Sequence, residues 1–211
     1  RDRLRSRGLG DVYKRQKNKR FEDYGNTVQR LYCRDLPETS SACRNITFQV
    51  TNGCNLRCSY CYEHHKGSEH MSVETGRKIV DYLLDQYERN DSDFINWNTR
   101  AVVLDFIGGE PLLEATLIEQ ICDYWFSECF RRDIPLAPFT RISFATNGQL
   151  WFSSEAQHLI EKYHDLMSIT ISIDGVQDLH DMYRLDEHGN GSFVKALSLI
   201  HISEPTRPEP I

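Results

Sequence analysis

The run Ile46-Thr47-Phe48-Gln49-Val50-Thr51-Asn52-Gly53 leads directly into Cys54-Asn55-Leu56-Arg57-Cys58-Ser59-Tyr60-Cys61, and these two segments decide the fold of the chain. The first predicts a β-strand that ends at the turn dipeptide Asn52-Gly53. The second places three thiols within eight residues of one loop. Thiolates at such short spacing bind either zinc or an iron–sulfur cluster, so the spacing alone leaves both kinds of site open.

The order of strand, loop and helix around the cysteines recurs three times further along the chain. Such repetition predicts parallel strands with right-handed crossovers, and it puts each candidate site at the carboxyl end of a strand. Four units are too few for an eight-fold barrel, so we expect an α/β fold that is a partial barrel. The run 101–107 is too apolar for a half-exposed strand. Further strands are predicted at 101–107, 141–146 and 167–173, and helices at 72–87, 114–131, 153–163 and 193–199.

The composition is that of an ordinary globular protein. The 211 residues suit one domain, and 39% hydrophobic and 27% charged residues are too apolar a mixture for disorder. No apolar run is long enough to span a membrane, and none resembles a signal peptide, so we expect no membrane partner. Seven cysteines, three of them at metal-ligand spacing, indicate a reducing, cytoplasmic location rather than a disulfide framework.

Charge is distributed unevenly along the chain. The net charge is −6, yet residues 1–20 carry nine Lys or Arg against two Asp. The remainder is therefore strongly acidic, which argues against nucleic acid as a partner. We interpret residues 1–20 and 197–211 as artefactual tails, because both resemble translated sequencing-adaptor DNA. Residues 21–45 are then a polar extension, and residues 46–196 form the core.

Three later motifs make the cysteine loop more specific. Gly108-Gly109-Glu110-Pro111 follows the second predicted strand, Thr146-Asn147-Gly148 the third, and Ser172-Ile173-Asp174-Gly175 the fourth. Together with Cys-x3-Cys-x2-Cys, this ordered series resembles the radical SAM (radical S-adenosylmethionine) superfamily. In particular it resembles the peptide-modifying branch that includes sulfatase maturases and peptide thioether maturases. The resemblance implies a partial (β/α)6 barrel, truncated after about four β/α units.

The resemblance assigns Cys54, Cys58 and Cys61 to a [4Fe-4S] cluster. Three thiolates leave one iron without a protein ligand, and an open coordination position is what a reactive metal centre needs. In the family, SAM occupies that position and is cleaved reductively to a 5′-deoxyadenosyl radical, which abstracts hydrogen from the substrate. Arg57, inside the loop, is suited to offset the negative charge of the cluster.

The remaining predicted site residues are contacts to SAM. The resemblance implies Tyr60 against the adenine, Gly108, Gly109 and Glu110 at the α-ammonium, Asn147 in a loop reaching toward SAM, Ser172 and Asp174 at the ribose hydroxyls, and Arg184 at the carboxylate. A guanidinium fork is well matched to a carboxylate.

Each of these motifs also has a purely structural interpretation. The glycine-rich and Asn-Gly segments are common in turns, and Asp174 is placed to cap Gly175. Arg184 has Asp181 and Glu187 nearby in sequence as ion-pair partners. His180 is a candidate for proton transfer, although a lone histidine is more often structural. Cys122 and Cys129 lie on one face of a predicted helix, which favours core packing.

The function predicted from the sequence is that of a radical SAM enzyme acting on a peptide or protein, with maturation by thioether cross-linking preferred. The expected electron donor is a flavodoxin or ferredoxin, and no residue is assigned a catalytic role beyond cofactor binding. One alternative is a sulfatase-type formylglycine maturase. Another is a non-catalytic interaction module in which His64 or His65 completes a Cys₃His zinc site.

Overall fold

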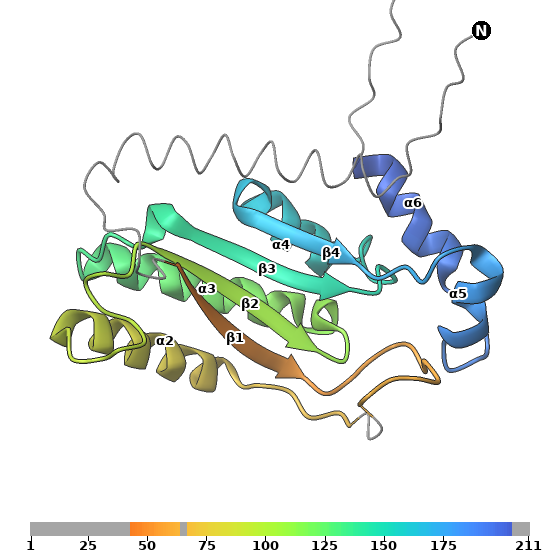
Figure 1. Ribbon diagram of the computed structural model, residues 1–211, viewed down its shortest axis with the longest axis horizontal. Coiled ribbons are helices and arrows are strands. Elements are labelled where there is room, and N and C mark those ends of the chain that lie inside the picture. Colours follow the sequence, from red (N-terminus) through yellow and green to blue (C-terminus); the bar gives the residue numbers. More distant parts are fainter. Residues whose placement is uncertain (1–42, 64–66, 204–211) are drawn as a thin grey trace, which may run out of the picture. The chain divides into compact units, whose positions relative to one another are not determined.

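The computed structural model describes residues 43–63 and 67–203, which form one parallel sheet with helical crossovers. The four strands lie side by side in chain order (Figure 1). This arrangement confirms the predicted α/β fold with a partial barrel. The strands are β1 (Cys43–Thr51), β2 (Ala101–Gly108), β3 (Thr140–Thr146) and β4 (Met167–Ile171); the helices are α2 (Val73–Arg89), α3 (Ala115–Arg131), α4 (Ser154–Tyr163), α5 (Gln177–Tyr183) and α6 (Phe193–Ser203).

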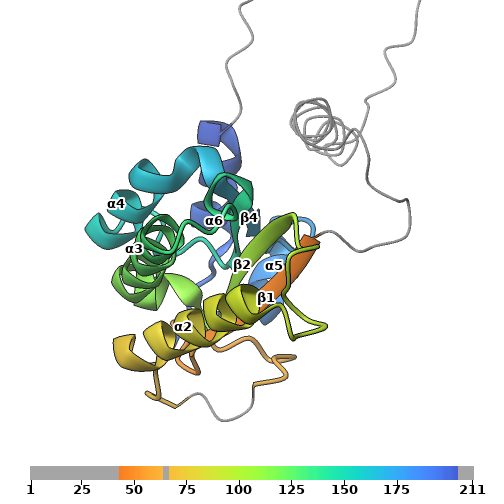
Figure 2. The same ribbon diagram turned by 90° about the vertical axis from the view of Figure 1, so that its left-hand side faces the viewer.

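The hydrophobic core lies between the sheet and the three longer crossover helices. Figure 2 shows α2, α3 and α4 in a row along one face of the sheet. Alternate strand residues point to that face, because successive side chains in a strand point to opposite sides. On β2 these are Val102, Leu104 and Phe106, all fully buried. Trp125 of α3 packs in the same cluster and donates a hydrogen bond to Thr140 Oγ1 at 2.9 Å.

The other face of β2 is partly open, which corrects the expectation of a strand buried on both sides. Its intervening residues are only half-buried, and Ile107 is 37% exposed. The described helices α2 to α4 cover one face, so apolar residues on the opposite face keep some contact with solvent. One-sided burial of this kind leaves room for a site on the open face and at the strand ends.

Several boundaries differ from those predicted. Strand β1 begins at Cys43 rather than residue 46, and β4 ends at Ile171 rather than residue 173. Helix α6 continues to Ser203, past the predicted helix end at residue 199, and helix α5 was not predicted as an element. The greater part of the expected tails and extension (residues 1–42 and 204–211) lies outside the described residues, as do Cys33, His64 and His65.

Helix α2, which follows the cysteine loop, is capped at both ends. Ser72 accepts a hydrogen bond from Thr75 N at 3.1 Å and so caps the start of α2. Asn90 ends that helix in the left-handed conformation at φ 52°. None of the helices within the described ranges combines the length and apolarity that a bilayer crossing demands.

Candidate functional site

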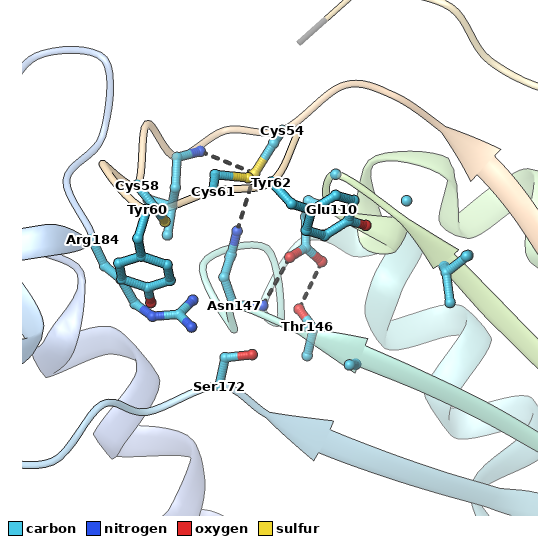
Figure 3. Close-up of a pocket in the computed structure, with 15 residues that line it drawn as sticks. Cys54, Cys58, Tyr60, Cys61, Tyr62, Glu110, Thr146, Asn147, Ser172 and Arg184 are labelled. Atoms are coloured by element: carbon cyan, nitrogen blue, oxygen red, sulfur yellow. Dashed lines mark hydrogen bonds between the residues drawn. The ribbon is translucent and has the colours of Figure 1, made fainter. Parts of the chain in front are cut away.

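The carboxyl ends of the four strands surround a cavity of about 360 Å³ (Figure 3). Parallel strands end at the same edge of a sheet, so loops far apart in sequence converge there. The cavity is where the structure brings the predicted site residues together, with Asp174 as the exception. Its lining includes Cys54, Cys58, Cys61, Tyr60, Gly108, Gly109, Glu110, Asn147, Ser172 and Arg184, together with Leu56, Tyr62, Ile107, Ala145 and Thr146.

The two glycines after β2 bring their loop against the start of the cysteine loop. Gly109 N donates to Thr51 O at 3.1 Å, and Glu110 N donates to Gly53 O at 2.9 Å. A Cβ on Gly109 would lie 2.7 Å from the Gly53 carbonyl carbon, and one on Gly108 would lie 2.5 Å from Thr51 O. Close approach between two backbones therefore requires these glycines before any ligand is considered.

Glu110 joins two of the loops through its buried carboxylate. It is 1% exposed and accepts hydrogen bonds from Thr146 Oγ1 at 2.7 Å, Asn147 N at 2.8 Å and Leu112 N at 3.1 Å. Burial raises the pKa of Glu110, and the three donors oppose that shift. A carboxylate offers about four acceptor positions, so one remains for a ligand such as an ammonium group.

Asn147 connects the loop after β3 to the cysteine loop. Its side-chain nitrogen donates to Asn55 Oδ1 at 2.7 Å and lies 3.9 Å from Cys54 Sγ (Figure 3). Gly148 follows at φ 78°, a conformation that favours glycine and lets the loop turn away. The Asn-Gly pair is therefore a turn, and its asparagine also lines the cavity.

The cysteine loop is held in place by a segment much later in the chain. Arg57 N donates to Leu185 O at 2.6 Å, and Ser59 N donates to Tyr183 O at 3.1 Å. Leu56 pairs with Asp186 in an isolated antiparallel bridge. This backbone ladder was not foreseen from the sequence, because neither segment has the composition of a strand. It orients the three thiols toward the cavity.

The three thiols line the cavity in an arrangement that is compatible with an iron–sulfur cluster, whereas His64 and His65, the candidate fourth ligands of a zinc site, lie outside the described residues. No three His, Cys, Asp or Glu side chains lie close enough to share one ion within residues 43–63 and 67–203. A four-iron cluster does not need such convergence, because each thiolate binds its own iron.

Cys122 and Cys129 are buried in α3, as predicted, and burial raises the pKa of both thiols.

Tyr60, Asp174 and Arg184 form a connected group beside the thiols. Arg184 Nε donates to Asp174 Oδ2 at 2.8 Å, and Tyr60 Oη donates to the same oxygen. The Arg184 guanidinium also lies 5.5 Å from the centre of the Tyr60 ring. The guanidinium holds the pKa of Asp174 below its usual value. Arg184 therefore pairs with neither of the partners suggested by the sequence, and Asp174 stands behind the cavity lining.

Ser172 lines the cavity. Because the predicted strand 167–173 includes Ser172, regular alternation of side chains would have put Ser172 and Asp174 on the same side. Strand β4 ends at Ile171, and Ser172 N makes one further hydrogen bond, to Thr146 O at 2.9 Å. Beyond that bond the backbone leaves the sheet, so Ser172 and Asp174 do not share a strand face. Thr146 belongs to one of the predicted strand-end motifs but had no role assigned to it, and Tyr62 was not singled out; both line the cavity as well.

Comparison with known proteins places the chain in a family. The model of the radical SAM superfamily matches residues 48–202. The uncharacterized protein MJ0907 of Methanocaldococcus jannaschii is 30% identical over 163 residues, covering 75% of this chain and 48% of that protein. The antilisterial bacteriocin subtilosin biosynthesis protein AlbA of Bacillus subtilis is 26% identical over 161 residues, covering 75% and 30%. A cysteine-type anaerobic sulfatase-maturating enzyme of Clostridium novyi is 27% identical over 160 residues, covering 72% and 38%.

Solved structures show the same fold. Native anSMEcpe with bound AdoMet and Kp18Cys peptide superposes with a TM-score of 0.58 at 24% identity, over 76% of this chain and 40% of that one. The chain spans less than half the length of the relatives named above. The family match covers most of the chain and includes every strand-end loop that lines the cavity. The chain thus belongs to the radical SAM superfamily, whose members use a [4Fe-4S] cluster and SAM.

Proposed function

We propose that this protein is a radical SAM enzyme that cleaves SAM reductively and abstracts a hydrogen atom from a peptide or protein. The observation that carries the proposal is the shared cavity of three thiols, a buried carboxylate and a guanidinium. When bound, a [4Fe-4S] cluster supplies the electron that breaks the carbon–sulfur bond of SAM. The chain itself supplies ligands, orientation and a partly enclosed site.

Each group of the cavity has a proposed task. Cys54, Cys58 and Cys61 would hold the [4Fe-4S] cluster as thiolates, with SAM binding beside it. Glu110 offers its remaining acceptor position to the SAM ammonium, and Arg184 pairs with the SAM carboxylate. These two groups are opposite in charge, and they match the two ends of an α-amino acid. Tyr60 and Ser172 contact the adenine and ribose, and Asn147 bounds the site beside Cys54.

Within this reaction class we propose that the protein matures a ribosomally made peptide by thioether cross-linking. Support comes from the similarity to the subtilosin biosynthesis protein and from the series of strand-end motifs. The similarity to a sulfatase-maturating enzyme supports formylglycine formation as a second candidate. We further propose a flavodoxin or ferredoxin as electron donor and the cytoplasm as location.

The decisive experiment is anaerobic reconstitution of the chain with iron and sulfide. We expect about four iron and four sulfide per chain, and 5′-deoxyadenosine after addition of SAM and dithionite. Cys58→Ala should lose both signals. Cys43→Ala is the matched control, because Cys43 is an exposed cysteine at the far end of β1. A colourless protein with one tightly bound zinc would instead support the interaction module. A cluster that yields no deoxyadenosine would refute reductive cleavage.

The two candidate products differ chemically, so mass spectrometry of treated peptides separates them. A thioether cross-link removes two hydrogens from the peptide and keeps its sulfur. Formylglycine formation from cysteine also removes two hydrogens, but in addition it releases the sulfur as sulfide and replaces it with an oxygen from water. Deuterium placed at the attacked carbon should appear in the deoxyadenosine. Deuterated peptides that leave the deoxyadenosine unlabelled would exclude hydrogen abstraction from those positions.

A further inference from the structure

His180 lies outside the cavity and has no task in the proposed function, yet it is almost fully buried. It sits on α5 with 1% exposure and forms two side-chain hydrogen bonds. Its Nδ1 accepts from Asp174 N at 3.3 Å, and its Nε2 lies 2.9 Å from Ser192 Oγ. The ring therefore bridges the loop after β4 and the start of α6.

The hydrogen-bond partners determine where the proton of the ring resides. Ser192 Oγ donates its only hydrogen to the Arg184 carbonyl at 2.7 Å. The hydroxyl must then accept from His180, so Nε2 carries the hydrogen. Asp174 N can only donate, so Nδ1 must be the acceptor. Each of the two hydrogen bonds therefore requires the neutral Nε2–H tautomer.

Ser192, at one end of this hydrogen-bonded bridge, is itself held in place by neighbouring residues. Asp181 Oδ1 accepts from Ser192 N at 2.8 Å and from Phe193 N at 2.9 Å. A Cβ on Gly191 would lie 2.5 Å from Asp181 Oδ2, so a larger residue does not fit there. The ring of Phe193 packs edge-on against His180 at 5.5 Å. Ser192 thus has little freedom to move away from the imidazole.

We propose that neutral His180 is a positioning residue for the Arg184–Asp174 pair and, through it, for the carboxylate of SAM. This role rests on the proposed function. One nitrogen of the ring fixes the backbone of Asp174, and the other, through Ser192, fixes the backbone of Arg184. Both ends of the ion pair beside the cavity are therefore held by one side chain that does not touch SAM.

The arrangement makes SAM binding sensitive to pH. The charged groups facing His180 are the guanidinium of Arg184 and the carboxylates of Asp174 and Asp181. Burial, and then Arg184, lower the pKa of His180 below 6.5, whereas the two carboxylates oppose that shift. A protonated ring would turn a second donor toward Asp174 N. The contribution of His180 is therefore complete above pH 6.5 and is lost as the pH falls through the lowered pKa.

A first experiment needs no cofactor. Nitrogen-15 NMR of the imidazole in the purified chain reports both tautomer and titration. We expect an Nε2–H tautomer that stays neutral to a pH below 6.5, the ordinary value for histidine. An Nδ1–H tautomer, or a His180 ring that is already protonated at pH 6.5, would overturn the proposal.

A second experiment measures equilibrium SAM binding to the cluster-containing chain. His180→Gln keeps a donor near the Nε2 position but loses the acceptor for Asp174 N, and we expect about tenfold weaker binding at pH 7.5 with unchanged iron content. His180→Asn keeps an acceptor near Nδ1 and should recover part of the affinity, without the pH dependence of the wild type. His158→Gln, at an exposed histidine on α4, is the matched control and should bind SAM as the wild type does.

The two proposals fail in different ways. A wild-type chain that assembles its cluster and binds no SAM would refute the proposed function. A wild-type chain that binds SAM with the same affinity as His180→Gln would refute only the positioning role. Equal pH dependence in the wild type and His180→Asn would refute it as well.

Discussion

Replacing Gly109 with alanine tests whether the cavity depends on backbone contact between two loops. The φ angle of Gly109 is not in the left-handed region, so alanine adds no conformational strain of its own. Its methyl group would instead lie 2.7 Å from the Gly53 carbonyl carbon and 2.9 Å from Asn52 O. Both neighbours are backbone atoms, which cannot rotate away as a flexible side chain can. The loop after β2 must therefore move outward.

The cost follows from what that movement breaks. Two backbone hydrogen bonds, to Thr51 O and Gly53 O, hold the loops together, and each contributes about 0.5–1.5 kcal/mol. Residual overpacking of the methyl group destabilises the folded state by a further amount of about 1–3 kcal/mol. Alanine also makes the unfolded chain less flexible than glycine does, which offsets about 0.4–1 kcal/mol of the loss. We expect a net loss of about 3 kcal/mol in the free energy of unfolding, or about a hundredfold in the folding equilibrium.

Urea unfolding of the cluster-free chain, followed by circular dichroism, measures this loss. Gly67→Ala is the matched control, because within residues 43–63 and 67–203 its new Cβ would have no neighbour closer than Glu69 N at 3.7 Å. We expect a clearly lower midpoint for Gly109→Ala and a wild-type midpoint for Gly67→Ala. Equal midpoints for the two variants would mean that the loops separate at little cost, and the argument from close approach would be wrong.

Three further substitutions probe buried polar groups. In Glu110→Gln, either orientation of the amide turns its NH2 group toward a buried N–H donor. Unfolding experiments should therefore show a loss of about 1–3 kcal/mol in the free energy of unfolding, and an unchanged midpoint would contradict this. The hydrogen bond from Arg131 lowers the pKa of Glu128 from 4.5 to about 2, so Glu128 stabilises the fold above pH 4.5 and this contribution is lost as the pH falls toward 2. In Glu128→Gln, the free energy of unfolding should therefore fall by about 2 kcal/mol less than in the wild type as the pH is lowered from 4.5 to 2. This figure is reduced for solvent screening of the exposed Arg131, and an equal pH dependence in the two proteins would refute the prediction. Thr140→Val leaves the buried Trp125 Nε1 without its acceptor and should cost about 1–3 kcal/mol in thermal unfolding, whereas an unchanged melting temperature would show that another acceptor replaces it.

The fold was largely predictable because its local signals agree with its long-range packing. Apolar runs in the four strands alternate with helices, and two of these helices, α2 and α4, start at a serine whose side chain caps the first turn. Helix α5 escaped prediction because its seven residues are too few to show a helical period, and Leu179 and Met182 are exposed. The half-exposed face of β2 was missed because an apolar sequence does not tell which face the helices will cover.

The lining of the cavity was predictable for a topological reason, whereas its hydrogen bonds were not. Cys54, Glu110, Asn147 and Ser172 each follow a parallel strand, and parallel strands bring such residues to one edge. The pairing of Asp174 depends instead on where β4 ends and on how the backbone turns afterwards. Sequence periodicity carries no information about that turn.

The cysteine loop gains its shape from residues made much later. Tyr60 bonds to Asp174 across 114 positions of the chain, and the ladder to residues 183–186 spans still more. A ribosome that has released the cysteine loop but not yet residues 183–186 has thus exposed all three thiols without the segment that orients them. Until that segment emerges, the thiols are open to oxidation and are not yet arranged to receive a metal centre.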